Sequence, residues 1–176
     1  MIILGIDPGN RCSGFAVIRW HSLQADILHM GVWRPSCRQT ACRIRELYDT
    51  VEWWLQNYFP DHVAVEVPFV HPRNPRSAAV LYRAVHVILT ALARNGYPWT
   101  EYGATQVKRC ITGSGRAEKR SIRRYLYRMI PECQRWDHMP DDAFDALAVA
   151  LCHGTYDVLG AVPVRVHTCT LHREEP

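Results

Sequence analysis

An apolar run that ends on an acid constrains the fold of this chain more than any other feature of its sequence. Residues 2–6 (IILGI) are apolar, Asp7 follows, a Pro-Gly-Asn turn comes next, and residues 14–20 return to mostly apolar side chains. Two such runs around a short turn predict a pair of adjacent strands. A carboxylate at the end of a buried strand is costly unless it is paired or binds a metal ion, and no cation stands beside Asp7. The rest of the chain therefore has to supply its partner.

Strand and helix patterns alternate along the rest of the chain. They predict further strands over 25–33, 62–67 and 98–102, and helices over 40–58, 77–95, 104–112, 117–130 and 140–154. Three strands in succession predict an antiparallel meander, and the later strand–helix–strand units predict parallel crossovers. We therefore expect an α/β fold with a mixed five-stranded sheet flanked by helices. A length of 176 residues fits one domain, which we place at 1–156, followed by a C-terminal tail over 157–176.

The composition excludes several classes of protein. The net charge of +4 is mildly basic, which is compatible with a nucleic-acid partner. No apolar run reaches the roughly 18 residues that a membrane span needs, and the first residues lack the pattern of a signal peptide. The seven cysteines are odd in number and contain no C-x-x-C, so we expect reduced thiols in a cytoplasmic protein. The nine histidines form no zinc-binding pattern.

Three further acids are candidates to share a site with Asp7. Glu66 lies inside a Val-rich strand, where an unpaired carboxylate is rare. Asp142 and Asp145 are three residues apart on an expected helix and so share one face. Taken singly, acids in the first turn of a helix can simply complement its dipole, and Asp7 before Pro-Gly can be a turn residue. Taken together, the four offer the oxygen ligands of hard divalent cations, and two such ions about 4 Å apart suit in-line attack on a phosphodiester.

Four segments of the chain resemble, in order, the blocks of the RuvC family of Holliday junction resolvases. They are ILGIDPGNRCSGFAVI, VAVEVPFVHPRNPRSA, EYGATQVKRCITGSGRAEK and DDAFDALAVALCH. The third segment is the most diagnostic, and the resemblance runs from about residue 2 to 153. It implies a ribonuclease H-like nuclease domain over 1–156. It also implies an endodeoxyribonuclease that resolves four-way DNA junctions by paired symmetric nicks, which leave 5′-phosphate and 3′-hydroxyl ends.

The resemblance also implies roles for single residues. Four acids fall on the metal ligands and catalytic acids of the family: Asp7, Glu66, Asp142 and Asp145. Lys108 and Lys119 fall on lysines that serve DNA binding and catalysis, and Phe69 falls on an aromatic residue associated with unstacking junction bases. Phe69 can equally be an apolar core residue at the end of a strand. The implied cofactor is a pair of Mg²⁺ ions, for which Mn²⁺ can substitute. The implied partners are a four-way junction, a second copy in a homodimer, and a branch-migration motor complex.

Cationic side chains are concentrated in the third segment and after it. They are Lys108, Arg109, Arg116, Lys119, Arg120, Arg123, Arg124 and Arg128, opposed only by Glu118. A solvated helix face explains part of this run, but the missing counter-charges favour phosphate binding. Arg73, Arg76 and Arg83 bracket the loop after Glu66 and could flank the centre of a junction.

Several alternatives stay open at this point. Tyr82 and His86 replace the small residues usual in the family's dimer helix, which leaves the geometry of a dimer open. His153 is either a helix-end histidine near the C-terminal dipole or a residue close to a second metal ion. The nuclease could act instead on another branched DNA or on an RNA–DNA hybrid. An actin-like ATPase and a non-catalytic DNA-binding module are more distant alternatives.

Overall fold

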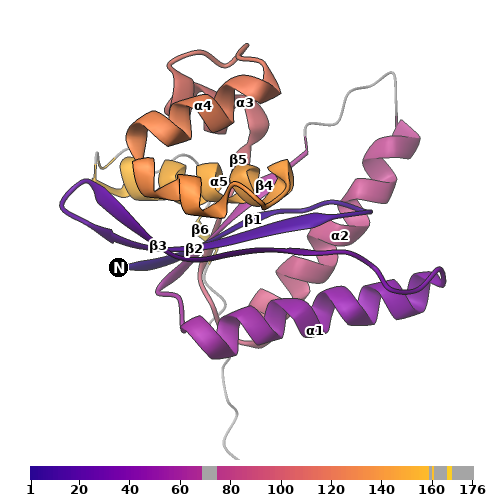
Figure 1. Ribbon diagram of the computed structural model, residues 1–176. Coiled ribbons are helices and arrows are strands. Elements are labelled where there is room, and N and C mark those ends of the chain that lie inside the picture. The colour runs from indigo at the N-terminus through magenta and orange to yellow at the C-terminus, as the bar shows by residue number, and fades with distance from the viewer. Residues whose placement is uncertain (69–74, 159, 161–165, 168–176) are drawn as a thin grey trace, which may run out of the picture.

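The computed structural model describes residues 1–68, 75–158, 160 and 166–167, which form one sheet with helices on both faces (Figure 1). The strands are β1 (Ile2–Asp7), β2 (Ser13–His21), β3 (Gln24–Trp33), β4 (His62–Val67), β5 (Trp99–Gly103) and β6 (Val166–His167). The helices are α1 (Thr40–Tyr58), α2 (Pro75–Arg94), α3 (Ala104–Thr112), α4 (Lys119–Met129), the 3₁₀ helix η1 (Pro131–Trp136) and α5 (Asp141–Val158).

The strand order is β3-β2-β1-β4-β5-β6, and the pairing is mixed. The first three strands form an antiparallel meander, whereas β1, β4 and β5 are mutually parallel because a helix carries the chain back between them. The predicted α/β fold with a mixed sheet is therefore confirmed, with all five predicted strands present. The two residues of β6 pair antiparallel with β5 and extend the sheet at its edge. They come from the segment we expected to be a tail, and the boundary at residue 156 stays a prediction.

Two apolar cores lie on the two faces of the sheet. Figure 1 shows α3, α4 and α5 on one face and α1 and α2 on the other. Side chains of a strand point alternately to the two faces, so Ile3 joins the core under α5 whereas Leu4 joins the core under α1 and α2. By the same alternation Asp7 falls on the α5 face. The sheet thus directs the acid at the end of β1 toward the helix that carries the other two aspartates.

Helix α5 packs unusually close to the sheet because two strand positions are glycine. A Cβ atom built on Gly14 would lie 1.8 Å from the backbone oxygen of Asp142, and one built on Gly5 would lie 2.2 Å from that of Ala146. Gly14 is also the pairing partner of Asp7 between β2 and β1. The first turn of α5 therefore docks directly beside the acid that ends β1.

One expectation about the cysteines is wrong. Cys37 and Cys42 form a disulfide in the segment that joins β3 to α1, while Cys12, Cys110, Cys133 and Cys152 are free. The start of α1 folds the chain back, so that the two Cα atoms lie 6.4 Å apart, within the range that a disulfide spans. The separation of the two cysteines along the sequence does not predict this distance. None of the described helices has the length and apolar character that a transmembrane segment requires.

Candidate active site

The acids at the ends of β1 and β4 are brought together by the register of the sheet. Ile6 pairs with Val65 in the parallel ladder, so Asp7 and Glu66 follow at the same level of two neighbouring strands. Parallel strands end at the same edge of a sheet, and residues in register point to the same face. For this reason two carboxylates separated by almost sixty residues of chain lie at one edge, on the α5 side.

These two acids line a cavity of about 190 Å³ together with Asp145 of α5 and Lys108 of α3. The remaining wall is apolar and consists of Ala104, Val107, Ile122 and Ala148. Three carboxylates and one ammonium group thus share a small space, and no imidazole or thiol belongs to the lining as far as the structure describes it. This donor set fits hard, oxygen-preferring cations such as Mg²⁺ and Mn²⁺ better than soft metals.

Helix α3 begins where β5 ends, and this abrupt start positions Lys108. The backbone N–H of Gly103 donates to the side-chain oxygen Oε1 of Gln106 at 2.8 Å, which closes the first turn of the helix. Lys108 follows one turn later, and Val107 beside it is buried in the core. The ammonium group therefore reaches the cavity from a helix that is anchored at both its start and its apolar face.

Asp142 lies one turn before Asp145 on α5, but it is not part of the cavity lining. Its carboxylate accepts a hydrogen bond from the thiol of Cys12, and the Arg34 guanidinium lies near the same thiol. Burial raises the pKa of Cys12 to about 11, with the bond to Asp142 as the next cause, so the thiol keeps its proton. The structure thus brings together Asp7, Glu66, Asp145 and Lys108, and places Asp142 at their margin. Sequence reasoning missed the Cys12 contact, for which the sequence carries no signal.

Of the predicted DNA-contacting residues, Lys108 lines the acidic cavity, and the others differ in what the structure describes of them. Phe69 and Arg73 lie outside the described residues, as do the side chains of Arg76, Lys119 and Arg120. Arg116 is exposed in the loop between α3 and α4, as a phosphate contact requires. Its role stays a prediction.

Arg123, which the sequence grouped with the other cations, has a structural position instead. Its guanidinium donates to the backbone oxygens of Asp137 and Met139 at 3.0 and 2.9 Å, and pairs with the Asp141 carboxylate at 3.3 Å. It also lies 4.0 Å from the centre of the Phe144 ring. These contacts tie α4 to the first turn of α5, so Arg123 holds the scaffold of the site.

His153 belongs to a buried polar cluster rather than to the end of a helix. Helix α5 continues to Val158, and His153 is only 3% exposed. A 2.8 Å hydrogen bond joins its Nδ1 to the hydroxyl of Tyr102, and its ring stacks on that of His62 at 4.1 Å between centroids. The helix-end interpretation is therefore wrong, because the helix runs more than a turn further than predicted. His153 does not line the acidic cavity, and it links α5 to β4 and β5.

Acid should destabilise the fold through this cluster. Burial, and then the neighbouring His62, lower the pKa of His153 to about 4, against about 6.5 in the unfolded chain. Between pH 6.5 and pH 4 the unfolded state binds a proton more readily than the folded state. The contribution of His153 to the free energy of unfolding is therefore present above about pH 6.5 and is lost as the pH falls toward 4. We expect urea unfolding to lose about 2 kcal/mol from this residue between pH 7.5 and pH 5.

A pair of substitutions isolates that contribution. His153→Gln should flatten the pH dependence of the free energy of unfolding, whereas His138→Gln, at an exposed position, should leave it unchanged. Equal slopes for wild type and His153→Gln would contradict the assignment.

Comparison with known proteins identifies the family. The family model described as "Crossover junction endodeoxyribonuclease RuvC" matches residues 3–153. The RuvC of Tolumonas auensis is 36% identical over 169 residues, which cover 94% of this chain and 94% of the relative. The chain belongs to the RuvC family. The RuvC of Hydrogenovibrio crunogenus is also 36% identical and covers 93% of each chain.

Solved RuvC structures agree with this assignment. Thermus thermophilus RuvC is 30% identical and superposes with a TM-score of 0.77, covering 92% of this chain and 98% of that one. The same protein in complex with a Holliday junction substrate gives a TM-score of 0.78, with 92% and 97% covered. The Fowlpox virus resolvase, at 15% identity and a TM-score of 0.59, shares the fold. The resemblance and the ribonuclease H-like fold predicted from four segments are confirmed, and RuvC membership implies dependence on a divalent metal ion.

Proposed function

We propose that this chain is a Holliday junction resolvase, a metal-dependent endodeoxyribonuclease that cuts four-way DNA junctions by paired symmetric nicks. The observation that carries the proposal is the convergence of Asp7, Glu66, Asp145 and Lys108 on one cavity in a member of the RuvC family. A ribonuclease H-like enzyme acting on another branched DNA or on an RNA–DNA hybrid would use similar acids. The junction is favoured because the T. thermophilus relative is described in complex with that substrate.

The carboxylates of this cavity would hold two Mg²⁺ ions, or Mn²⁺ in their place. Asp7, Glu66 and Asp145 supply ligand oxygens from three elements, and Asp142 would complete the set from the same face of α5. When bound, the ions supply an activated water and neutralise charge on the phosphate and the leaving 3′ oxygen. The acids keep the ions in place, and hydrolysis leaves a 5′-phosphate and a 3′-hydroxyl.

The other walls of the cavity contribute orientation and charge. Lys108 offsets the negative charge that develops on the scissile phosphate, and Lys119 at the start of α4 would add a second cation. Val107, Ile122 and Ala148 form an apolar wall of the cavity, and such surroundings of low polarity strengthen each charge–charge interaction. Lys108 and Lys119 would also bind DNA, together with Phe69, Arg73, Arg76, Arg116 and Arg120.

The partners follow from the substrate. A four-way junction has near two-fold symmetry, so a homodimer would present two cavities to two equivalent strands. A branch-migration motor complex would deliver the junction, and the setting would be the cytoplasm. Sedimentation of the purified protein at micromolar concentration tests the dimer, since a monomer there contradicts paired nicking.

The decisive assay compares DNA structures at fixed metal concentration. The full chain is incubated with Mg²⁺ and labelled four-way junction, flap, RNA–DNA hybrid or linear duplex. We expect paired nicks at symmetric positions of the junction, sealed afterwards by a ligase, and little cutting of the other substrates. Preferential cutting of the hybrid would replace this proposal with the alternative, and no metal-dependent cutting of any substrate would overturn both.

Lys108 offers a more selective prediction. Lys108→Ala should lower the single-turnover cleavage rate by about a hundredfold, because one donor to the developing charge is lost, while junction affinity changes far less. Arg45→Ala, at an exposed position on α1 on the opposite face of the sheet, removes a charge of the same sign far from the cavity and should leave the rate close to wild type. Equal losses in both variants would mean that general charge, and not position, is responsible.

A further inference from the structure

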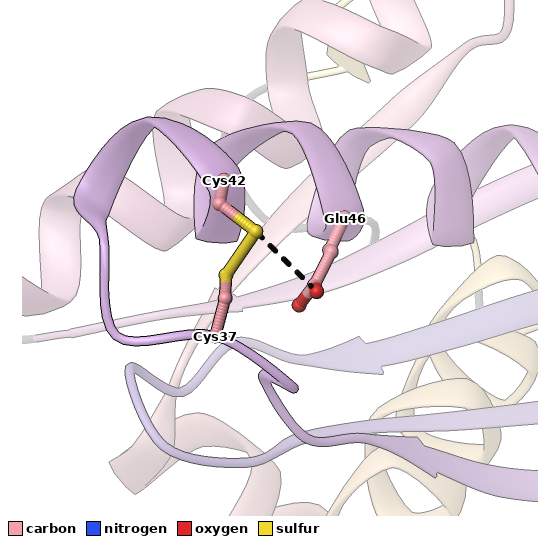
Figure 2. A group of neighbouring side chains, drawn as sticks. All are labelled: Cys37, Cys42 and Glu46. Atoms are coloured by element: carbon pink, nitrogen blue, oxygen red, sulfur yellow. Dashed lines mark hydrogen bonds between the residues drawn. A yellow bond between two sulfur atoms is a disulfide. The ribbon is translucent and has the colours of Figure 1, made fainter.

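A second group of potential metal ligands lies outside the acidic cavity. Ligand atoms of Cys37, Cys42 and Glu46 all lie within 4.8 Å of one another at the start of α1 (Figure 2). All three residues are half-buried, and in the part of the chain that the structure describes no other three His, Cys, Asp or Glu side chains approach so closely. The proposed nuclease reaction does not use this group.

Local geometry explains why the three side chains meet. Cys42 and Glu46 are four residues apart on α1, so they lie on the same face of the helix, one turn from each other. Cys37 is brought over that face by the bend that precedes the helix. In Figure 2 the disulfide lies beside the carboxylate, with 3.6 Å between Cys42 Sγ and Glu46 Oε1.

The carboxylate of this group is already oriented by hydrogen bonds. The backbone N–H of Ser36 donates to Glu46 Oε2 at 3.0 Å, and the Ser36 hydroxyl donates to Oε1. Supporting hydrogen bonds of this kind fix the direction of metal-binding carboxylates in known sites.

We propose that reduction of the Cys37–Cys42 disulfide converts this group into a binding site for a soft divalent cation of the Zn²⁺ class. A cellular dithiol is oxidised to its own disulfide while the protein disulfide takes up two electrons and two protons and becomes two thiols. Binding of one cation then releases those two protons and forms two metal–thiolate bonds, with Glu46 as the third ligand and water in the fourth position.

The position at the start of α1 and the spacing of the two cysteines suit a metal ion. Cys42 lies in the first turn of α1, where free backbone N–H groups and the helix dipole stabilise negative charge, and that turn contains no acidic residue. A Cα–Cα distance of 6.4 Å lets rotation of the two side chains separate the sulfurs to ~3.8 Å, which tetrahedral coordination at about 2.3 Å per bond needs. The acidic cavity prefers hard ions, so the two sites select different metals.

The test uses Cd²⁺ as the probe, because cadmium–thiolate bonds give an ultraviolet charge-transfer absorption that carboxylates do not. The full chain is titrated in its reduced and its oxidised form, in excess Mg²⁺ so that the acidic cavity is occupied. We expect one Cd²⁺ per chain with the absorption of two thiolates after reduction, displacement by Zn²⁺, and no such signal from the disulfide form. Equal signals from both forms, or none from the reduced form, would overturn the proposal.

Variants locate the signal. Cys37→Ser and Cys42→Ser should each abolish tight binding, and Glu46→Gln should weaken it by at least about tenfold. Cys110→Ser is the matched control, because Cys110 contacts the thiol of Cys152 and forms the competing sulfur pair. If Cys110→Ser removes the signal while Cys37→Ser keeps it, the site is elsewhere and the proposal is wrong. The readout does not depend on DNA cleavage. The metal-site proposal can therefore be contradicted while the nuclease assignment stands, and the nuclease assignment can be contradicted while the metal site is confirmed.

Discussion

Asp7→Asn is expected to abolish junction cleavage, with a rate loss of more than about a thousandfold, while junction binding stays within a few-fold of wild type. The amide keeps the shape of the side chain but removes the charge that would hold the metal ions. Asp7 ends β1 in register with Glu66 and shares its cavity with Asp145, so its loss removes one of the three carboxylates that would hold the ions there. Single-turnover cleavage and a gel-shift assay in Ca²⁺ separate the two effects.

The matched control is the same acid-to-amide change on an exposed helix face. Asp49→Asn removes a carboxylate of α1 that faces Arg45 at the surface and should cleave at the wild-type rate. Glu66→Gln and Asp145→Asn should repeat the loss seen for Asp7→Asn. Wild-type cleavage by any of these three would remove that residue from the active site, and lost binding in all three would indicate a folding defect.

Gly14→Ala should have the largest effect on stability of any single methyl group added to the strands. The new Cβ atom would lie 1.8 Å from the Asp142 backbone oxygen and 2.4 Å from its carbonyl carbon, so the first turn of α5 must move away from β2. Displacement of packed backbone is costlier than displacement of a flexible side chain, and we expect a loss of about 3 kcal/mol or more in urea unfolding. Cleavage should fall as well, since Gly14 pairs with Asp7 and lies against Asp142.

Gly103→Ala provides the comparison for that change. Its Cβ atom would meet only the Gln106 side-chain oxygen at 3.4 Å, and its backbone angles are accessible to alanine. We expect a loss of stability below about 1 kcal/mol. Similar stabilities for Gly14→Ala and Gly103→Ala would show that α5 can shift freely, and the account of how the site is assembled would then fail.

Much of the fold follows from local patterns in the sequence. The alternation in residues 62–67 and the helical spacing over 40–58 predict elements that the structure contains with those bounds. The two-residue strand β6 and the short helix η1 escaped prediction because so few residues show no period. The helix over 140–154 was predicted too short because Gly154 is a common stop signal. In the structure Gly154 lies within α5, where it packs against the ring of Trp20, and the helix continues to Val158.

The acids of the site were predicted from their types and from resemblance to a family, and three of the four share a cavity. The partners of His153 and the pairing of Cys37 with Cys42 escaped prediction for one reason. Each depends on which group lies opposite in space, Tyr102 and His62 in the first case and the two cysteines themselves in the second. Spacing along the chain says little about such pairs.

By itself, then, the sequence determined the order of the longer strands and helices, the acids that could share a site with Asp7, and the family to which the chain belongs. Only the tertiary structure decided that Gly14 admits α5 beside Asp7, that Asp142 contacts Cys12, and that Glu46 meets a disulfide. The physical reason is range. Hydrophobic periodicity can be read within a short stretch of sequence, because it reports which side chains of that stretch are buried. The contacts of a site join segments that are far apart in the sequence, and the distances between those segments are set by packing.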